Sequence, residues 1–191
     1  AQQLLEAGIS DRSLIVGENL GLPTERIHHL SLEAAATRHF APLNIVVVIR
    51  PESAGKNSSA SSSLPLFGLP EAAFEHEAGM ITKMEVRAVV LALLHLEPGL
   101  VLWDLGAASG SVSIEAARLV ALKEVIAVEK QGPRYEALRR NIKAFGLAEI
   151  RAVHGTAREV LAELPDPDRV FIGGSGNDLP EVLQQVSERL R

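Results

Sequence analysis

The 191-residue chain contains no cysteine, and this absence excludes disulfide-linked folds, thiolate metal sites and thiol nucleophiles. It also lacks an excess of positive charge, because 19 Lys and Arg stand against 24 Asp and Glu, a net charge of -5. Such a chain lacks the overall excess of basic residues with which a protein binds the phosphates of a nucleic acid. Its apolar runs, such as AVVLALL at 88–94, are far shorter than the roughly 20 residues that cross a bilayer. We therefore expect no nucleic-acid or membrane partner, and a cytoplasmic location.

The remaining composition is that of a globular protein, with 47% hydrophobic and 23% charged residues. One segment departs from it: SAGKNSSASSS at 53–63 has six serines in eleven positions and no large apolar side chain. Nothing in such a segment offsets the entropy of ordering it. We predict a linker over 53–65 that separates a first piece, 1–52, from a second, 66–191. Because the chain opens on AQQLLEAGIS without a methionine, we expect its start to be a cut inside a longer protein.

The first piece predicts a short α/β arrangement. We expect helices at 1–7 and 32–40 and strands at 13–16 and 44–49. The β-branched run IVVVI at 45–49 predicts a strand that is buried on both faces. About fifty residues are marginal as an independent domain because they bury too little of their surface. We interpret this piece as the tail of a domain whose front lies upstream.

The second piece alternates strands and helices with regular spacing. Strands are predicted at 100–104, 124–128, 150–153 and 169–172, and helices at 111–121, 133–146, 157–163 and 179–190. An earlier helix is predicted to start at a T-x-x-E capping box formed by Thr82 and Glu85. This order predicts an α/β fold with a doubly wound parallel sheet.

The segment VLWDLGAASGSVSIEAA at 101–117 joins the first strand of that sheet to a helix through a glycine-containing turn. Gly106 permits the tight turn, and Gly110 permits close approach of the helix. The second strand ends in Glu129, nineteen residues after Gly110. At about this separation in sequence from the glycine turn, a carboxylate can accept both hydroxyls of an adenosine ribose. The G-x-x-x-G spacing differs from the G-x-G-x-x-G that seats a pyrophosphate. The motif favours a nucleotide-like ligand without a diphosphate.

These residues resemble the first two motifs of class I S-adenosylmethionine-dependent methyltransferases. GMITKMEVRAVVLALL at 79–94 and LPDPDRVFIGGSG at 164–176 add a more specific resemblance, to the decarboxylating half of the precorrin-6Y C5,15-methyltransferases of cobalamin biosynthesis. It runs from about Leu66 to the end of the chain. VGENLGLPTERIHHL at 16–30 and FAPLNIVVVI at 40–49 resemble the end of the other half, the tetrapyrrole methylase. The family's sheet continues beyond the fourth strand, where this chain stops.

The resemblance implies a set of site residues. It implies that Thr82 touches the cofactor S-adenosylmethionine, that Glu129 holds its ribose, and that the turn at Gly155 faces its adenine. The full set for the cofactor is Thr82, Gly106, Ala107, Ala108, Ser109, Gly110, Glu129, Thr156 and Ala157, and the candidate lip of the substrate pocket is Gly173, Gly174 and Ser175. Ala108 stands where the family usually has glycine. No general acid, general base or metal ligand is assigned.

The implied reaction is methylation of a precorrin at C15 with loss of carbon dioxide from the C12 acetate, the C5 methylation belonging to the other half. Two other functions stay open: a cofactor-binding fragment without turnover, and a nicotinamide-dependent oxidoreductase on a similar fold. The substrate is a small tetrapyrrole, and a homo-oligomer is compatible with the sequence. We interpret the basic run RYEALRRNIK at 134–143 as a solvated helix face. The alternative, that its cations attract the carboxylates of a tetrapyrrole substrate near the pocket, stays open.

Overall fold

The computed structural model describes residues 1–50, 64–174 and 178–191. It contains two compact units, Ala1–Ser61 and Ser62–Arg191. Most of the predicted linker, residues 53–63, lies outside the described residues. Among the helices of the described segments, none has the length and apolar character needed to traverse a lipid bilayer.

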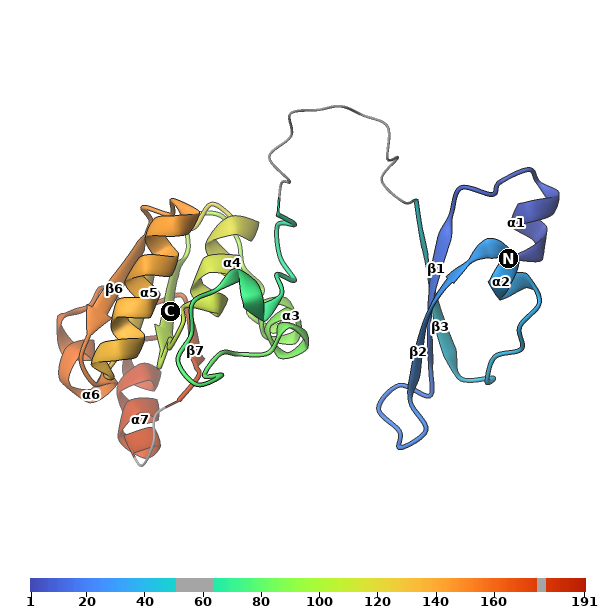
Figure 1. The fold of residues 1–191 in the computed structure, drawn as a ribbon. Helices are drawn as coiled ribbons and strands as arrows, with labels where there is room; N and C mark the ends of the chain where they lie inside the picture. The colour runs from blue at the N-terminus through green and yellow to red at the C-terminus, as the bar shows by residue number, and fades with distance from the viewer. Residues whose placement is uncertain (51–63, 175–177) are drawn as a thin grey trace. The chain divides into compact units, whose positions relative to one another are not determined.

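The first unit is a three-stranded antiparallel sheet in the order β2-β1-β3, with two short helices (Figure 1). Its small core contains Leu14 and Val16 of β1 with Leu32 and Ala35 of α2. The elements are α1 (Gln2–Glu6), β1 (Ser13–Glu18), β2 (Arg26–Ser31), α2 (Leu32–Ala36) and β3 (Asn44–Ile49).

Strand β3 corrects one prediction and strand β2 another. Each side chain from Ile45 to Ile49 is between 40% and 61% exposed, so the prediction that the IVVVI run is buried on both faces is wrong. The reason is that β3 lies at the edge of the sheet, where β1 is its one partner among the described strands, while the core of this unit gathers around β1 and α2. Strand β2 was not predicted. In its sequence RIHHLS, the two adjacent histidines interrupt the alternation of apolar and polar residues that indicates a strand.

The second unit is a parallel sheet in the order β6-β5-β4-β7. The predicted doubly wound α/β architecture is confirmed, and each predicted strand of this unit is found within two residues of its expected ends. The elements are η1 (Glu71–Ala73), α3 (Met84–Leu93), β4 (Val101–Leu105), α4 (Ser111–Leu119), β5 (Glu124–Glu129), α5 (Gly132–Phe145), β6 (Ile150–His154), α6 (Ala157–Val160), η2 (Leu161–Glu163), β7 (Arg169–Ile172) and α7 (Leu179–Arg189).

Alternate side chains of the central strands serve two cores. Leu102 of β4 packs in a cluster with residues of α3, α4 and α5, whereas Trp103 packs in a second cluster with residues of η2 and α7. This alternation follows from the period of two residues in a strand. Both faces of the sheet are therefore covered, as Figure 1 shows, and the carboxyl ends of the parallel strands share one edge.

The start of α3 differs from its prediction. The helix begins at Met84 with Lys83 at the N-cap, and the side chain of Lys83 makes no capping hydrogen bond, so the predicted capping box of Thr82 and Glu85 is wrong. The N–H of Met84 donates instead to Glu71 Oε1 at 3.2 Å. The carbonyl of Thr82 accepts a hydrogen bond from Arg87 Nη1 at 2.6 Å. The backbone turns one residue later than a T-x-x-E box requires, and the Thr82 hydroxyl has no capping role.

A fully buried ion pair fixes the segment that precedes α3. Arg87 of α3 and Glu115 of α4 are both 0% exposed, with Nη2 and Oε1 3.2 Å apart. Glu115 also accepts hydrogen bonds from the backbone N–H groups of Gly68 and Leu69, and Arg87 donates to the Leu69 carbonyl. Because buried charges are retained only with such partners, the segment from Gly68 to Thr82 is attached to two helices.

Candidate functional site

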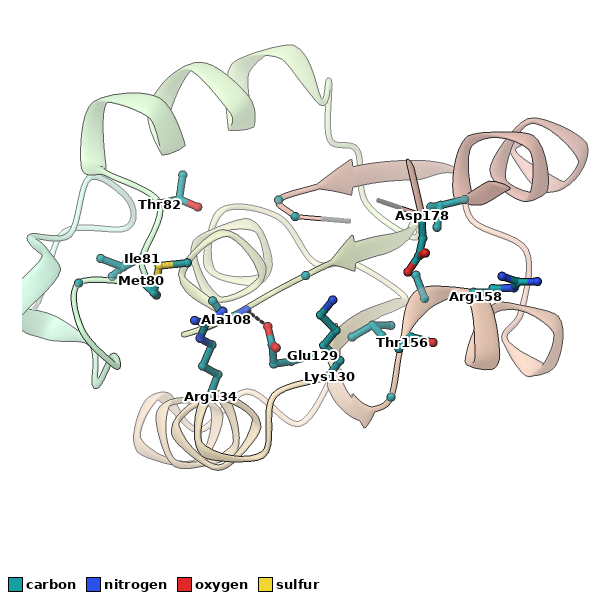
Figure 2. Close-up of a pocket in the computed structure, with 18 residues that line it drawn as sticks. Met80, Ile81, Thr82, Ala108, Glu129, Lys130, Arg134, Thr156, Arg158 and Asp178 are labelled. Carbon is teal, nitrogen blue, oxygen red and sulfur yellow. Dashed lines mark hydrogen bonds between the residues drawn. The ribbon is translucent and has the colours of Figure 1, made fainter. Parts of the chain in front are cut away.

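A cavity of about 440 Å³ opens at the carboxyl edge of the parallel sheet. Figure 2 shows it enclosed by the segment before α3, the loop after β4, the end of β5 and the turn before α6. Ligands of doubly wound sheets bind at this edge, and the volume lies in the range of small-molecule sites. The lining residues are Gly79, Met80, Ile81, Thr82, Gly106, Ala108, Val128, Glu129, Lys130, Arg134, Gly155, Thr156, Ala157, Arg158, Gly173, Gly174, Asp178 and Val182.

Two glycines give the loop between β4 and α4 its shape. Gly106 has a φ of +80°, and a Cβ there would lie 2.8 Å from the backbone nitrogen of Gly174. Gly110 has a φ of +76°, and a Cβ there would collide with the Leu138 side chain. Positive φ and close approach both exclude larger residues, so the predicted roles of these two glycines in the turn match the geometry.

Ala108 adopts a left-handed backbone angle, which glycine adopts far more readily than alanine. Its φ is +47°, in the left-handed region where a Cβ costs about 1–2 kcal/mol. Its N–H donates to Glu129 Oε2 at 2.9 Å. The loop therefore keeps a glycine-like conformation at 108 in spite of the alanine, and a side-chain hydrogen bond holds it there.

Glu129 joins the loops that follow three neighbouring strands. Its side chain accepts from Ala108 N at 2.9 Å and from Gln131 N at 2.8 Å, and its own carbonyl accepts from Gly155 N at 3.1 Å. Although the residue is only 4% exposed, it lines the cavity, and Figure 2 shows its carboxylate beside Ala108. A carboxylate has about four acceptor sites, so two further donors can be accommodated.

Asp104 lies behind the same loop, at the end of β4. Its Oδ2 accepts from the N–H of Ser113 at 3.2 Å and from the Ser113 hydroxyl at 2.6 Å, which caps the first turn of α4 from outside the helix. Burial raises the pKa of Asp104 to about 6, with a smaller upward contribution from Glu129, while the Ser113 hydrogen bonds oppose the increase. Burial therefore disfavours the charged form of this carboxyl, and the hydrogen bonds from Ser113 offset part of that cost.

The turn before α6 contains a capping box, formed by Thr156 and Glu159. The Thr156 hydroxyl accepts from Glu159 N, and the Glu159 side chain accepts from Thr156 N. This reciprocal pair fixes the Gly155–Ala157 turn at the rim of the cavity.

The predicted site residues divide into three groups. Those that line the cavity are Thr82, Gly106, Ala108, Glu129, Thr156, Ala157, Gly173 and Gly174. Ala107, Ser109 and Gly110 are buried and do not line it; the Ser109 carbonyl instead accepts from Asn141 Nδ2 at 2.8 Å, so these three support the loop. Ser175 lies outside the described residues.

Four charged residues of the lining were not predicted as site residues: Lys130, Arg134, Arg158 and Asp178. Arg134 belongs to the run interpreted as a solvated helix face, and for this residue that interpretation is wrong. Its position in the first turn of α5, directly after the strand that ends in Glu129, is the signal that could have identified it. Arg139 and Arg140 of the same run do not line the cavity and pair with Glu136 and Glu75.

We expect the substitution Ala108→Gly to increase the free energy of unfolding by up to about 1 kcal/mol. Relief of the left-handed strain outweighs the added entropy of the unfolded glycine, about 0.5–1 kcal/mol. Urea unfolding measures the change. The control is Ala107→Gly, which removes a buried methyl at a residue outside the positive-φ set and should destabilise the fold. Equal losses in both variants would contradict the role of φ.

Asp104 predicts a pH-dependent stability. Its folded pKa of about 6 lies above the ordinary value of 3.8, so its contribution to stability is complete below pH 3.8 and is lost as the pH rises through 6. The difference corresponds to roughly 3 kcal/mol. Because Asp104→Asn stays neutral, its free energy of unfolding relative to wild type should increase between pH 4 and pH 7.5 in urea titrations. A difference that does not change with pH would refute this assignment.

Comparisons with known proteins relate this chain to the precorrin methyltransferases. The family model for the precorrin methyltransferase domain matches residues 72–191. The chain is 43% identical over 126 residues to a probable cobalt-precorrin-6B C(15)-methyltransferase (decarboxylating) of Pyrobaculum calidifontis, covering 64% of this chain and 65% of that protein. It is 35% identical over 192 residues to a precorrin-6Y C(5,15)-methyltransferase [decarboxylating] of Sinorhizobium sp, covering 100% of this chain and 45% of that protein.

A solved structure supports the same relationship. The crystal structure of precorrin-6Y C5,15-methyltransferase from Geobacter metallireducens matches with a TM-score of 0.65 and 44% identity, over 66% of this chain and 68% of that chain. The chain spans 65% and 45% of the lengths of the two sequence relatives. The predicted resemblance and the predicted class I methyltransferase fold are confirmed. The chain belongs to the precorrin methyltransferase domain family.

Proposed function

We propose that the unit Ser62–Arg191 binds S-adenosylmethionine and directs its methyl group to C15 of a precorrin, with decarboxylation of the C12 acetate. The observation that carries this proposal is the hydrogen bond between Ala108 N and Glu129 Oε2. It joins the loop after β4, which has positive φ angles at Gly106, Ala108 and Gly110, to the acid that ends β5. Ala108 and Glu129 both line the cavity of about 440 Å³. The names of the two sequence relatives supply the substrate class and the position of methylation.

The residues present fit this cofactor. Glu129 keeps acceptor capacity for the two ribose hydroxyls, and the Thr156–Ala157 turn offers a fixed surface for adenine. Thr82, Gly106 and Ala108 also line the cavity, and we assign them to the methionine portion of the cofactor. When bound, S-adenosylmethionine supplies an electrophilic methyl group on a sulfonium.

The chain's own contribution is positioning. Transfer of a methyl group requires donor and acceptor carbons in line, and correct orientation can supply most of the rate acceleration. Gly173 and Gly174 follow β7 and line the cavity, so we assign them to the lip that receives the substrate. Ser175 is included in that assignment, although it lies outside the described residues. No described residue is assigned as a general acid or base.

The same proposal extends to the rest of the chain. We assign residues 1–52 to the end of a tetrapyrrole methylase domain that would perform the C5 methylation, supported by an alignment of the whole chain with a C(5,15)-methyltransferase. Residues 53–65 are assigned as the linker and 66–191 as the cofactor-binding domain. The partner is a small tetrapyrrole rather than a nucleic acid or membrane, in accordance with the net charge of -5. The location is the cytoplasm, with which the absence of cysteine agrees. Family membership disfavours the nicotinamide-dependent alternative.

Calorimetry and turnover test this function. We expect S-adenosylhomocysteine to bind, NAD not to bind, and a precorrin with a free C15 position to gain one methyl group and lose carbon dioxide. Binding of NAD without S-adenosylhomocysteine would favour the oxidoreductase. Binding of S-adenosylhomocysteine without methyl transfer would favour the cofactor-binding fragment instead of the transferase.

The substitution Glu129→Gln should weaken S-adenosylhomocysteine binding by about 10- to 100-fold, because hydrogen bonds to a charged group contribute about 1.5–3 kcal/mol. The same change places an amide NH₂ against the N–H of Ala108 or Gln131, so loop distortion must be separated from ribose recognition. Titration with the 2′,3′-dideoxy analogue makes this separation, since its affinity should fall much less.

Glu124→Gln is the matched control. Glu124 lies at the opposite end of β5 and pairs with the exposed Arg151 at 2.8 Å, so its substitution should leave both affinities intact. Equal losses for the two ligands in Glu129→Gln would show that Glu129 acts on the loop and not on the ribose.

A further inference from the structure

Arg134 presents a guanidinium to the end of the cavity that contains Ala108. It belongs to the first turn of α5 and lines the cavity. Figure 2 shows its side chain reaching from α5 toward Ala108, on the opposite side of Glu129 from Thr156. The side chain is 29% exposed, so the group is partly withdrawn from solvent but open to a ligand.

One edge of this guanidinium is already occupied. Arg134 Nε donates to Glu77 Oε2 at 3.3 Å. Among the hydrogen bonds of the described residues, none uses the Nη groups of Arg134. Glu77 precedes the lining residues Gly79–Thr82, so the ion pair links α5 to that segment. The contact orients the guanidinium and leaves a planar pair of N–H donors, the arrangement that binds a carboxylate through two parallel hydrogen bonds.

The order of the cavity residues identifies which carboxylate this is. Figure 2 shows Glu129 between Ala108 on one side and Thr156 on the other. With ribose at Glu129 and adenine at Thr156, the remaining portion of the cofactor extends toward Ala108 and Arg134. That portion is an amino acid, and its carboxylate is the anionic group on the cofactor.

We propose that Arg134 binds the amino-acid carboxylate of the cofactor through its Nη donors and that Glu77 is the positioning residue that orients it. This proposal rests on the proposed function. Lys130 and Arg158 are the other cations of the lining; Figure 2 shows Arg158 on the Thr156 side and Lys130 next to Glu129, so neither shares the Ala108 end. A carboxylate of the substrate is the competing occupant.

The test compares two ligands that differ in the amino-acid portion. S-adenosylhomocysteine contains it, whereas 5′-methylthioadenosine keeps the adenine, ribose and thioether without it. In calorimetry, Arg134→Gln should lower the affinity for S-adenosylhomocysteine by about 10- to 100-fold. The affinity for 5′-methylthioadenosine should change less than about twofold. Arg134→Lys should recover part of the loss, because it restores the charge without the planar pair of donors. Glu77→Gln should lower the affinity for S-adenosylhomocysteine by a smaller factor than Arg134→Gln does.

Arg139→Gln is the control, because Arg139 is on the same helix, pairs with Glu136 and does not line the cavity. It should leave both affinities unchanged. Equal losses of both ligands in Arg134→Gln, or no loss of either, would overturn the inference while leaving the proposed function in place. Loss of precorrin affinity with retained S-adenosylhomocysteine affinity would assign Arg134 to the substrate and also overturn it. Failure of wild type to bind either ligand would overturn both proposals.

Discussion

The carboxylate of Glu129 is the interaction on which the organisation of the site depends. Through two side-chain hydrogen bonds and one backbone carbonyl, this residue joins the loop after β4, the start of α5 and the turn after β6. A buried carboxylate needs such donors to offset the loss of hydration. The donors that stabilise it are supplied by the backbone segments that surround the cavity, so the carboxylate and the loops hold each other in place.

A second buried charge orders the other wall of the cavity. The Arg87–Glu115 pair attaches the segment from Gly68 to Thr82 to α3 and α4. Replacing such a pair by apolar residues is often neutral or stabilising for the fold, so stability alone does not account for it. Its hydrogen bonds to backbone groups at both ends of the segment account for the position of Thr82 at the cavity.

Not every buried polar group near the glycine loop has a hydrogen-bond partner in the part of the chain that the structure describes. Asp104 Oδ1 and Ser109 Oγ are buried without a hydrogen-bond partner among the described residues, and Ala108 holds a positive φ. Departures from good local geometry concentrate at functional sites, where surrounding contacts hold them in place. All three residues lie at or next to the turn that the sequence motif predicted, which connects the local strain with the proposed cofactor site.

The sequence by itself determined the parallel sheet and the position of the site along the chain. The alternation of apolar runs with capped helices predicted β4 to β7 closely, because both features act within a few residues. Gly106, Gly110 and Glu129 were predicted because a tight turn and a strand-terminal acid are local requirements.

Only the tertiary structure decided the properties that depend on distant neighbours. The exposure of β3 follows from its place at the edge of a sheet whose core gathers around β1 and α2. At the start of α3, the N–H of Met84 donates to Glu71 and the Thr82 carbonyl accepts from Arg87, instead of the local capping box that the sequence predicted. The place of Arg134 in the cavity depends on how α5 packs beside the loop after β4 and on Glu77, 57 positions away in sequence. A sequence pattern reports the period of one helix face, but which cation of that face meets the cavity depends on the packing of segments that are far apart in the chain.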